Sequence, residues 1–143
     1  MSDAQTRTID EIRATILQMP FAQEAELEIE LGTGDQGIAS IPLSTAMTYD
    51  GSAFAAFAVG LIADVAAGAS TLSVTPADQM ALTAGIESRI TSSTRCERLR
   101  ATATRRERIG DRLIYDTVVD AVRADGSSRQ CGDAVITMQI VGG

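Results

Sequence analysis

An apolar stretch that holds one acidic residue constrains this chain more than any other feature. Residues 52–68 read SAFAAFAVGLIADVAAG, and Asp64 is the one charged residue among them. A helix that is apolar on every side is normally buried. An isolated ionised carboxylate in a core is costly, so Asp64 must be paired, hydrogen-bonded, protonated or placed at the wall of a cavity. Because the chain contains no histidine, Asp64 becomes the first candidate for acid–base chemistry near neutral pH.

Length and composition exclude several classes of protein. The 143 residues, 45% of them hydrophobic, are enough for one domain with a real core, and we expect a single domain over residues 1–143. The apolar stretch is too short, and too rich in Ala and Gly, to be read as a membrane span. A net charge of −7 and only five aromatic residues argue against nucleic-acid binding.

Two further features concern the compartment. The first residues are polar and contain no signal-peptide core. Cys96 and Cys131 lack the paired spacing of a metal site and are typical of small buried thiols in a reducing environment. We therefore expect a cytoplasmic protein that holds no metal.

The N-terminal part predicts a helix followed by two strands. Thr8 and Glu11 form a capping box, and the apolar spacing after it indicates a short helix that Pro20 stops, within residues 1–20. Residues 24–31 alternate glutamate with apolar residues, as in a half-buried strand with a solvated outer face. The turn at 32–37 then leads into a strand over residues 38–43.

The C-terminal half predicts four strands by alternation. The first strand has the predicted inward row Leu82, Ala84, Ile86, Ser88 and Ile90, and the second has Leu99, Ala101 and Ala103. In the third, Tyr115, Thr117, Val119 and Ala121 alternate with Asp116, Val118, Asp120 and Val122. In the fourth, Ala134, Ile136, Met138 and Ile140 alternate with Val135, Thr137, Gln139 and Val141. With the long helix placed before them, this order predicts an α+β fold. Its curved antiparallel sheet wraps around one long central helix, because such wrapping buries a helix that is apolar all round.

This order of elements resembles the hotdog fold, and above all the acyl-CoA thioesterases similar to the enzyme of the phenylacetate pathway. The resemblance covers about residues 20–141 and rests on the topology, on the segment 61–68 (LIADVAAG) and on the strand that follows at residue 81. It implies that Asp64 stands where the family has a carboxylate that acts on a thioester as general base or nucleophile. It also implies a homodimer of edge-to-edge sheets, or a homotetramer, with sites at the subunit interface. Coenzyme A would be part of the substrate, and no separate cofactor is implied.

The chain departs from the family at two places. The family usually carries His-Gly-Gly about nine residues before the carboxylate, and residues 55–57 here are Ala-Ala-Phe. An Asn that often precedes that motif would fall near Tyr49, whose neighbour is Asp50. Two functions therefore stay open: a hydrolase of small or medium acyl thioesters with Asp64 as base or nucleophile, or a non-catalytic hotdog module that binds acyl-CoA or a similar ligand.

Four residues accompany Asp64 as candidates for the catalytic site. Tyr49, Asp50 and Ser52 stand just before or at the start of the apolar helix, where Asp50 or Ser52 could serve as its N-cap or contact the substrate carbonyl. Thr83 lies near the place where the family presents a Ser or Thr across a dimer interface, and it could equally be an ordinary strand residue.

The positive charges indicate where coenzyme A would bind. All twelve positive side chains are arginines, and ten of them follow residue 80. In the related thioesterases, basic side chains on strand ends and turns hold the phosphates of coenzyme A, which would make Arg89, Arg95 and Arg98 the phosphate ligands. A solvated face of mixed charge is the alternative interpretation.

Overall fold

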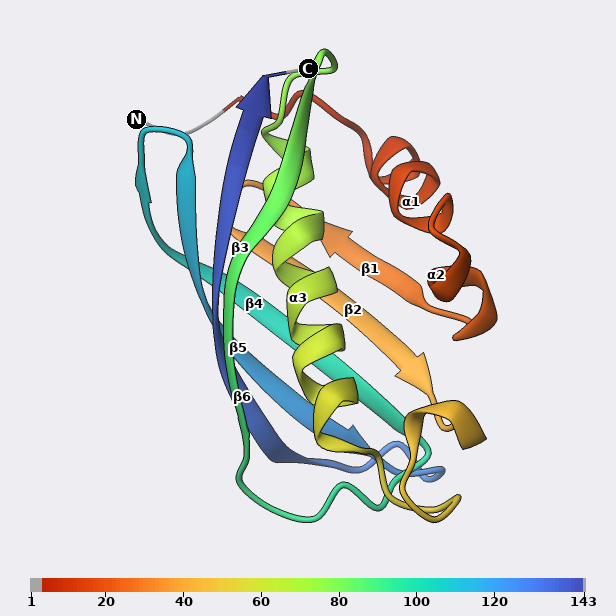
Figure 1. Ribbon diagram of the computed structural model, residues 1–143. Coiled ribbons are helices and arrows are strands. Elements are labelled where there is room, and N and C mark those ends of the chain that lie inside the picture. Colours follow the sequence, from red (N-terminus) through yellow and green to blue (C-terminus); the bar gives the residue numbers. More distant parts are fainter. Residues whose placement is uncertain (1–3, 143) are drawn as a thin grey trace.

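The computed structural model of the protein describes residues 4–142, and six strands in this part of the chain form one antiparallel sheet. The order across the sheet is β1-β2-β4-β5-β6-β3. The strand bounds are β1 (Glu28–Gly32), β2 (Gln36–Pro42), β3 (Gln79–Ile90), β4 (Arg98–Ile109), β5 (Arg112–Val122) and β6 (Ser128–Gly142). Figure 1 shows the strands curving around one side of a long helix, α3 (Ala56–Ser73). The α+β architecture predicted from the sequence is confirmed.

The core lies between α3 and the inner face of the sheet. The predicted inward row of β4 is buried. On β5 and β6 the structure shows which of the two alternating sets faces the core: the buried ones are Tyr115, Thr117, Val119 and Ala121, and Ala134, Ile136, Met138 and Ile140. Helix and sheet approach closely where small residues meet, because the backbone of Gly37 on β2 packs directly against that of Ala66 on α3. By length and composition α3 could cross a membrane, but 72% of it is buried inside this fold, as in the core helix of a globular protein.

The N-terminal segment is more helical than the sequence indicated. The capping box is present: the Thr8 hydroxyl accepts from the Glu11 N–H, and the Glu11 carboxylate accepts from the Thr8 N–H. Helix α1 (Ile9–Leu17) is followed by α2 (Pro20–Glu24), and a short 3₁₀ turn (Thr45–Met47) follows β2. The predicted strand over 24–31 is wrong in its first half. Pro20 starts a second helix at a position where its missing N–H costs nothing, and Glu26 has a φ of 53°, so β1 begins only at residue 28.

The central helix is displaced from its predicted bounds. It was expected over 52–68, but it begins at Ala56 and ends at Ser73. Neither Asp50 nor Ser52 is its N-cap. Ala55 takes that position without a side-chain hydrogen bond, because residues 53 and 54 are held in short β-bridges to Arg95 and Thr48. Gly68 does not end the helix, since hydroxyl-bearing residues beyond it continue the buried face, with Ser70, Thr71 and Ser73 fully buried.

A β-bulge in β3 changes the residues that face the helix. Thr83 pairs with Met138 on β6, but the next pair is Gly85 with Thr137, so Ala84 has no partner of its own. The bulge shifts the alternation by one residue. Thr83 therefore shares the inner face with Ile86 and Ser88, whereas Leu82 and Ala84, predicted to point inward, do not belong to that row. β3 is also an edge strand, and Leu82, Ile86 and Ile90 keep 41–46% of their surface exposed.

Candidate active site

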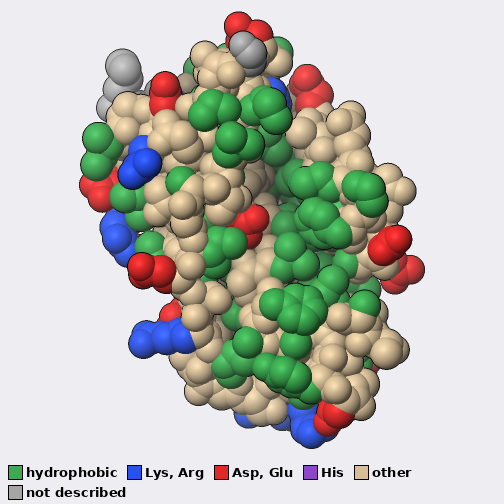
Figure 2. Space-filling model, viewed as in Figure 1, with side chains coloured by type: hydrophobic (Ala, Val, Ile, Leu, Met, Phe, Trp, Pro, Cys, Tyr) green, Lys and Arg blue, Asp and Glu red, His purple; other side chains and the backbone are tan. Residues whose placement is uncertain are grey.

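Asp64 lies on the one stripe of α3 that the sheet does not cover. Most of the helix is buried, but Phe57, Leu61, Asp64 and Gly68 are exposed or half-buried, and their spacing of three or four residues places them on one face. Figure 1 shows α3 in front of β2, β4 and β5 with β3 running beside it, and Figure 2 shows hydrophobic side chains gathered around a hollow in the same view. The carboxylate is thus set in an apolar, partly open surface.

Thr83 holds the carboxylate from the neighbouring strand. Its hydroxyl donates a hydrogen bond of 2.7 Å to Asp64 Oδ1. The bulge after Thr83 makes this contact possible, because it keeps Thr83 on the inner face while the rest of β3 changes alternation. The sequence proposed both residues, and the structure brings them together.

Burial raises the pKa of Asp64 above its ordinary value, while the hydrogen bond from Thr83 acts in the opposite direction and lowers it. The burial effect is the larger of the two, because the charged form loses solvation in an apolar surrounding. A carboxylate with a raised pKa is a stronger base than an exposed one, and it is still ionised when the pH exceeds that raised value.

An apolar cavity of about 340 Å³ opens beside this pair. Residues of α3, β3 and β6 line it together with Ile16, Met19 and Phe21 of the N-terminal helices. Asp64 is the one charged side chain among its lining residues. Met19 and Phe21 were not among the site residues predicted from the sequence. The apolar spacing in this segment predicts a helix, but spacing alone does not say which part of the cavity the helix covers.

The loop before α3 forms a second polar cluster. Asp50 Oδ1 accepts hydrogen bonds from the Ser52 N–H (2.9 Å), the Ser52 hydroxyl (2.9 Å) and the Ala53 N–H (3.1 Å). These bonds, with a smaller contribution from the Arg95 guanidinium, lower the pKa of Asp50 well below its usual range. Arg95 contacts both Asp50 and Ser52. Tyr49, 71% exposed, accepts the N–H of Ala56 at 3.2 Å through its hydroxyl oxygen.

Within one protomer the two clusters are separated. Ala56 is eight residues before Asp64, and at 1.5 Å per residue the two lie about 12 Å apart along the helix. Tyr49, Asp50, Ser52 and Arg95 gather at the N-terminus of α3, whereas Asp64 and Thr83 meet two turns further on. One acyl group cannot touch both clusters of the same chain at its carbonyl carbon.

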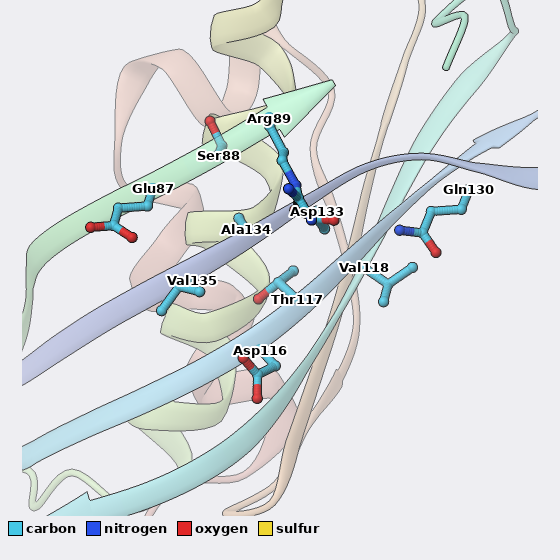
Figure 3. Close-up of a pocket in the computed structure, with 10 residues that line it drawn as sticks. All are labelled: Glu87, Ser88, Arg89, Asp116, Thr117, Val118, Gln130, Asp133, Ala134 and Val135. Atoms are coloured by element: carbon cyan, nitrogen blue, oxygen red, sulfur yellow. Dashed lines mark hydrogen bonds and ion pairs between the residues drawn. The ribbon is translucent and has the colours of Figure 1, made fainter. Parts of the chain in front are cut away.

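The other two predicted phosphate ligands carry carboxylate partners on the outer face of the sheet. Arg89 Nε donates to Asp133 Oδ1 at 2.8 Å, and Figure 3 shows both side chains in a groove that Glu87 and Asp116 also line. Arg98 contacts Glu28 at 3.4 Å and donates to the Ser40 hydroxyl at 2.9 Å. Over residues 4–142 the structure contains no group of three or more Cys, Asp and Glu side chains arranged to hold a metal ion.

Comparisons of the whole fold identify its architecture. A thioesterase-family protein of Silicibacter pomeroyi superposes with a TM-score of 0.84 at 19% identity, over 92% of this chain and 96% of that one. A thioesterase of Pseudomonas aeruginosa gives 0.81 at 17% identity, over 99% of both chains. The PaaI protein of Escherichia coli, from the phenylacetic acid degradation operon, gives 0.75 at 15% identity, over 92% of this chain and 91% of that one.

The protein has the hotdog fold. The solved structures it resembles are thioesterase-family hotdog proteins, PaaI among them, as the order of elements in the sequence indicated. No family model matches the sequence, and no curated protein matches it. At these identities the hotdog resemblance concerns the fold alone. Residues 55–57 (Ala-Ala-Phe), the position at which the resemblance implied His-Gly-Gly, occupy the N-cap and the first two positions of α3.

Proposed function

We propose that this protein is a thioester hydrolase that acts on a coenzyme A thioester with a small or medium acyl group. One observation carries the proposal: Asp64, the one charged residue of α3, meets Thr83 at the wall of an apolar cavity. The hotdog fold and its thioesterase neighbours supply the context. An isolated carboxylate with a raised pKa, set in a cavity of this kind, is typical of a functional group.

The reaction that these residues support is general-base hydrolysis. Asp64 takes a proton from a water molecule as the water oxygen attacks the thioester carbonyl carbon. The carbonyl oxygen becomes an oxyanion, and backbone N–H donors stabilise it. When the tetrahedral intermediate collapses, the C–S bond breaks and the thiolate of coenzyme A takes the proton from Asp64. The products are a carboxylic acid and a free thiol. Direct attack by the Asp64 carboxylate, through an anhydride that water then cleaves, uses the same residue.

The oxyanion donors are proposed to come from a second copy of the chain. The first-turn N–H groups of α3 lie at the positive end of the helix dipole, and that of Ala56 is bonded to the Tyr49 hydroxyl, which a substrate oxygen could replace. They lie about 12 Å from Asp64 of the same chain, beyond the reach of one carbonyl group. Antiparallel pairing of two β3 edges would bring the helix start of one copy towards Asp64 of the other. β3 ends the sheet and exposes Met80, Leu82, Ile86 and Ile90, as an edge that pairs in an assembly does.

The remaining parts of the proposal follow from this arrangement. Within it, Tyr49, Asp50 and Ser52 lie beside the partner's thioester, and the Tyr49 hydroxyl gives up the Ala56 N–H to the substrate oxygen. Arg95, in the same loop, is the best placed of the three predicted phosphate ligands; Arg89 and Arg98 would first have to leave their carboxylate partners. We propose a homodimer or a homotetramer in the cytoplasm, where the free, buried thiols of Cys96 and Cys131 would stay reduced.

A panel of acyl-CoA substrates, with release of the free thiol as the signal, tests the activity. We expect Asp64→Asn to lower kcat by roughly 10²- to 10⁴-fold, the usual contribution of a general base. Asp78→Asn is the matched control, since Asp78 is exposed in the loop between α3 and β3. Undiminished turnover in Asp64→Asn would remove Asp64 from the mechanism.

Mixing two inactive variants tests the shared site. Ala56→Pro removes one first-turn N–H at a helix position that favours proline, after a residue that is already extended (φ −72°, ψ 156°). A dimer of Asp64→Asn with Ala56→Pro holds one intact site. Random reassembly after mild denaturation should therefore restore about a quarter of the wild-type activity. A mixture no more active than its components would show that each chain builds its site alone.

A second function is favoured by the absence of His-Gly-Gly. Without the imidazole, the protein would bind acyl-CoA and not turn it over. Saturable binding of acyl-CoA with no thiol release at any chain length would establish this alternative and end the hydrolase proposal.

A further inference from the structure

We infer that the cavity beside Asp64 takes the acyl chain of the substrate, that this chain carries no charge at its far end, and that Gly68 leaves the room for it. The inference rests on the proposed function, because it assigns the cavity to the acyl part of a thioester whose carbonyl lies at Asp64. It concerns the substrate class that the site selects.

The cavity follows α3 away from Asp64. Gly68 and Leu72 lie one and two helical turns further on, which is about 6 Å and 12 Å along the axis. β3 runs back beside the helix, so that Thr83 lies next to Asp64 and Ala81 lies nearer the helix end. An acyl chain whose carbonyl is at Asp64 would therefore extend over Gly68 towards Leu72.

Gly68 lines the cavity without a side chain of its own. A Cβ atom added there would lie 3.9 Å from Met138 Cε, an ordinary contact, so glycine is not required by the packing of the fold. A helix interior normally disfavours glycine by about 0.5–1 kcal/mol relative to alanine. A glycine that the fold does not need, at the wall of an apolar cavity one turn from the carboxylate, leaves space for a ligand.

The N-terminal helices form the far wall. Ile16 of α1, Met19 and Phe21 all line the cavity, and Met19 and Phe21 keep 41% and 36% of their surface exposed. Large apolar side chains with this much exposed surface gain free energy when a second apolar surface covers them. Met19 is unbranched and adapts its shape to a ligand.

The chemistry of the lining sets the selectivity. The cavity offers no cation or amide side chain to a polar chain terminus, and its one charged group is the Asp64 carboxylate. An acyl chain that ends in a carboxylate would lose its solvation there without a partner and would face a like charge. A volume of about 340 Å³ is near the lower end of the roughly 300–1,000 Å³ usual for ligand pockets, which fits a small or medium acyl group.

Chain-length profiles of three variants test the inference. For the wild-type protein we expect kcat/KM to rise from acetyl-CoA by about fourfold for each methylene buried, until the chain reaches the wall of Met19 and Phe21. Succinyl-CoA should be hydrolysed more slowly than butyryl-CoA, which has the same chain length. Gly68→Val should lower kcat/KM for octanoyl-CoA by at least tenfold and leave acetyl-CoA within about twofold. Met19→Ala should move the optimum to longer chains.

Gly142→Val is the control for Gly68→Val. A Cβ atom at Gly142 meets nothing within 4 Å, and Gly142 is not among the residues that line the cavity. This variant should keep the wild-type profile. Circular dichroism and thermal unfolding of each variant show whether it is folded.

The possible outcomes separate this inference from the proposed function. If Gly68→Val lowers kcat/KM equally for all acyl-CoAs, or for none of them, the cavity does not hold the acyl chain. A preference for succinyl-CoA over butyryl-CoA would lead to the same conclusion. If no acyl-CoA is hydrolysed at all, the affinity of alkyl-CoA thioethers from ethyl to dodecyl, measured by calorimetry, tests whether the cavity holds the chain. Affinity that rises with chain length and is lost in Gly68→Val would support the cavity although the hydrolase proposal had failed. Affinity independent of chain length would overturn the inference.

Discussion

The contact of Gly37 with α3 predicts a large loss of stability from the addition of one methyl group. A Cβ atom at Gly37 would lie 1.9 Å from the carbonyl oxygen of Ala66, where an ordinary contact is 3.4–4 Å. Both sides of this contact are backbone, so no side chain can turn away, and helix and sheet would have to separate by more than an ångström. Overpacking of this kind usually costs 1–3 kcal/mol or more. We expect Gly37→Ala to destabilise the protein by about 3 kcal/mol and to lower Tm by roughly 10 °C.

Urea unfolding followed by circular dichroism measures this effect, with Gly68→Ala as the control. Gly68 has room for a methyl group, with Met138 Cε at 3.9 Å, and it lies inside α3. That substitution should be neutral or should stabilise the protein by about 0.5–1 kcal/mol, because alanine favours a helix. If the two variants unfold at the same urea concentration, α3 does not rest on the backbone of β2 as the structure has it. The height of Asp64 above the sheet would then be set by other contacts.

Two further substitutions test buried polar groups. Asp64→Asn should stabilise the protein at neutral pH, because the raised pKa of Asp64 in the folded state means that folding disfavours the charged carboxylate. The gain in stability should be absent below the pKa of the unfolded state, about 3.9, and should grow as the pH rises through the pKa of the folded state. Thermal unfolding from pH 3 to 8 would show or refute this dependence. Tyr115→Phe should lower the free energy of unfolding in urea by about 1–3 kcal/mol, since the buried Tyr115 hydroxyl donates to Ser70 at 2.9 Å and accepts from Thr71 at 3.1 Å. The control is Tyr49→Phe, which removes a hydroxyl from an exposed residue and should lower it less. Equal losses of stability in the two variants would contradict this account.

The sequence predicted those parts of the fold in which one face of an element is uniformly buried. Alternation predicted the strands β4, β5 and β6, and the inward row that it gave for β4, Leu99 to Ala103, is buried. The capping box at Thr8 is a local interaction between residues three apart, so the sequence pattern alone predicts it. The order of these elements was enough to indicate the hotdog fold, because few arrangements bury a helix that is apolar on almost every side.

The errors share a different cause, namely tertiary contacts that override local pattern. The alternation at 24–31 reads as a strand, yet Pro20 starts a helix before it and Glu26 turns the chain with a positive φ. The bulge at Ala84 depends on pairing with β6, so the sequence of β3 alone placed the wrong residues inward. At the start of α3, Asp50 hydrogen-bonds its own loop, and the residues after it are held in β-bridges.

The sequence predicted which residues belong to the candidate site better than how these residues are arranged in space. Asp64 is visible in the sequence because a charge in an apolar helix is costly, and Thr83 was found through the family resemblance. The distance between Asp64 and the loop of Tyr49 and Asp50 follows from the true helix bounds, which sequence patterns gave four to five residues too early. Met19 and Phe21 were missed because their role depends on where the N-terminal helices lie against the cavity.

The absence of histidine makes the pH profile of the proposed hydrolase a direct test of its base. Burial raises the pKa of Asp64, so kcat/KM should rise with pH in a limb that lies at higher pH than the limb of an ordinary carboxylate, and should then reach a plateau. No imidazole can add a limb, and burial raises the pKa of both thiols, that of Cys131 to about 11, so the plateau should persist through neutral and mildly alkaline pH. Thr83→Val removes the hydrogen bond that lowers the pKa of Asp64 and should move the limb to higher pH, whereas Thr83→Ser, which keeps a hydroxyl, should restore its position. A limb that stays in place in Thr83→Val would mean that the base is not Asp64.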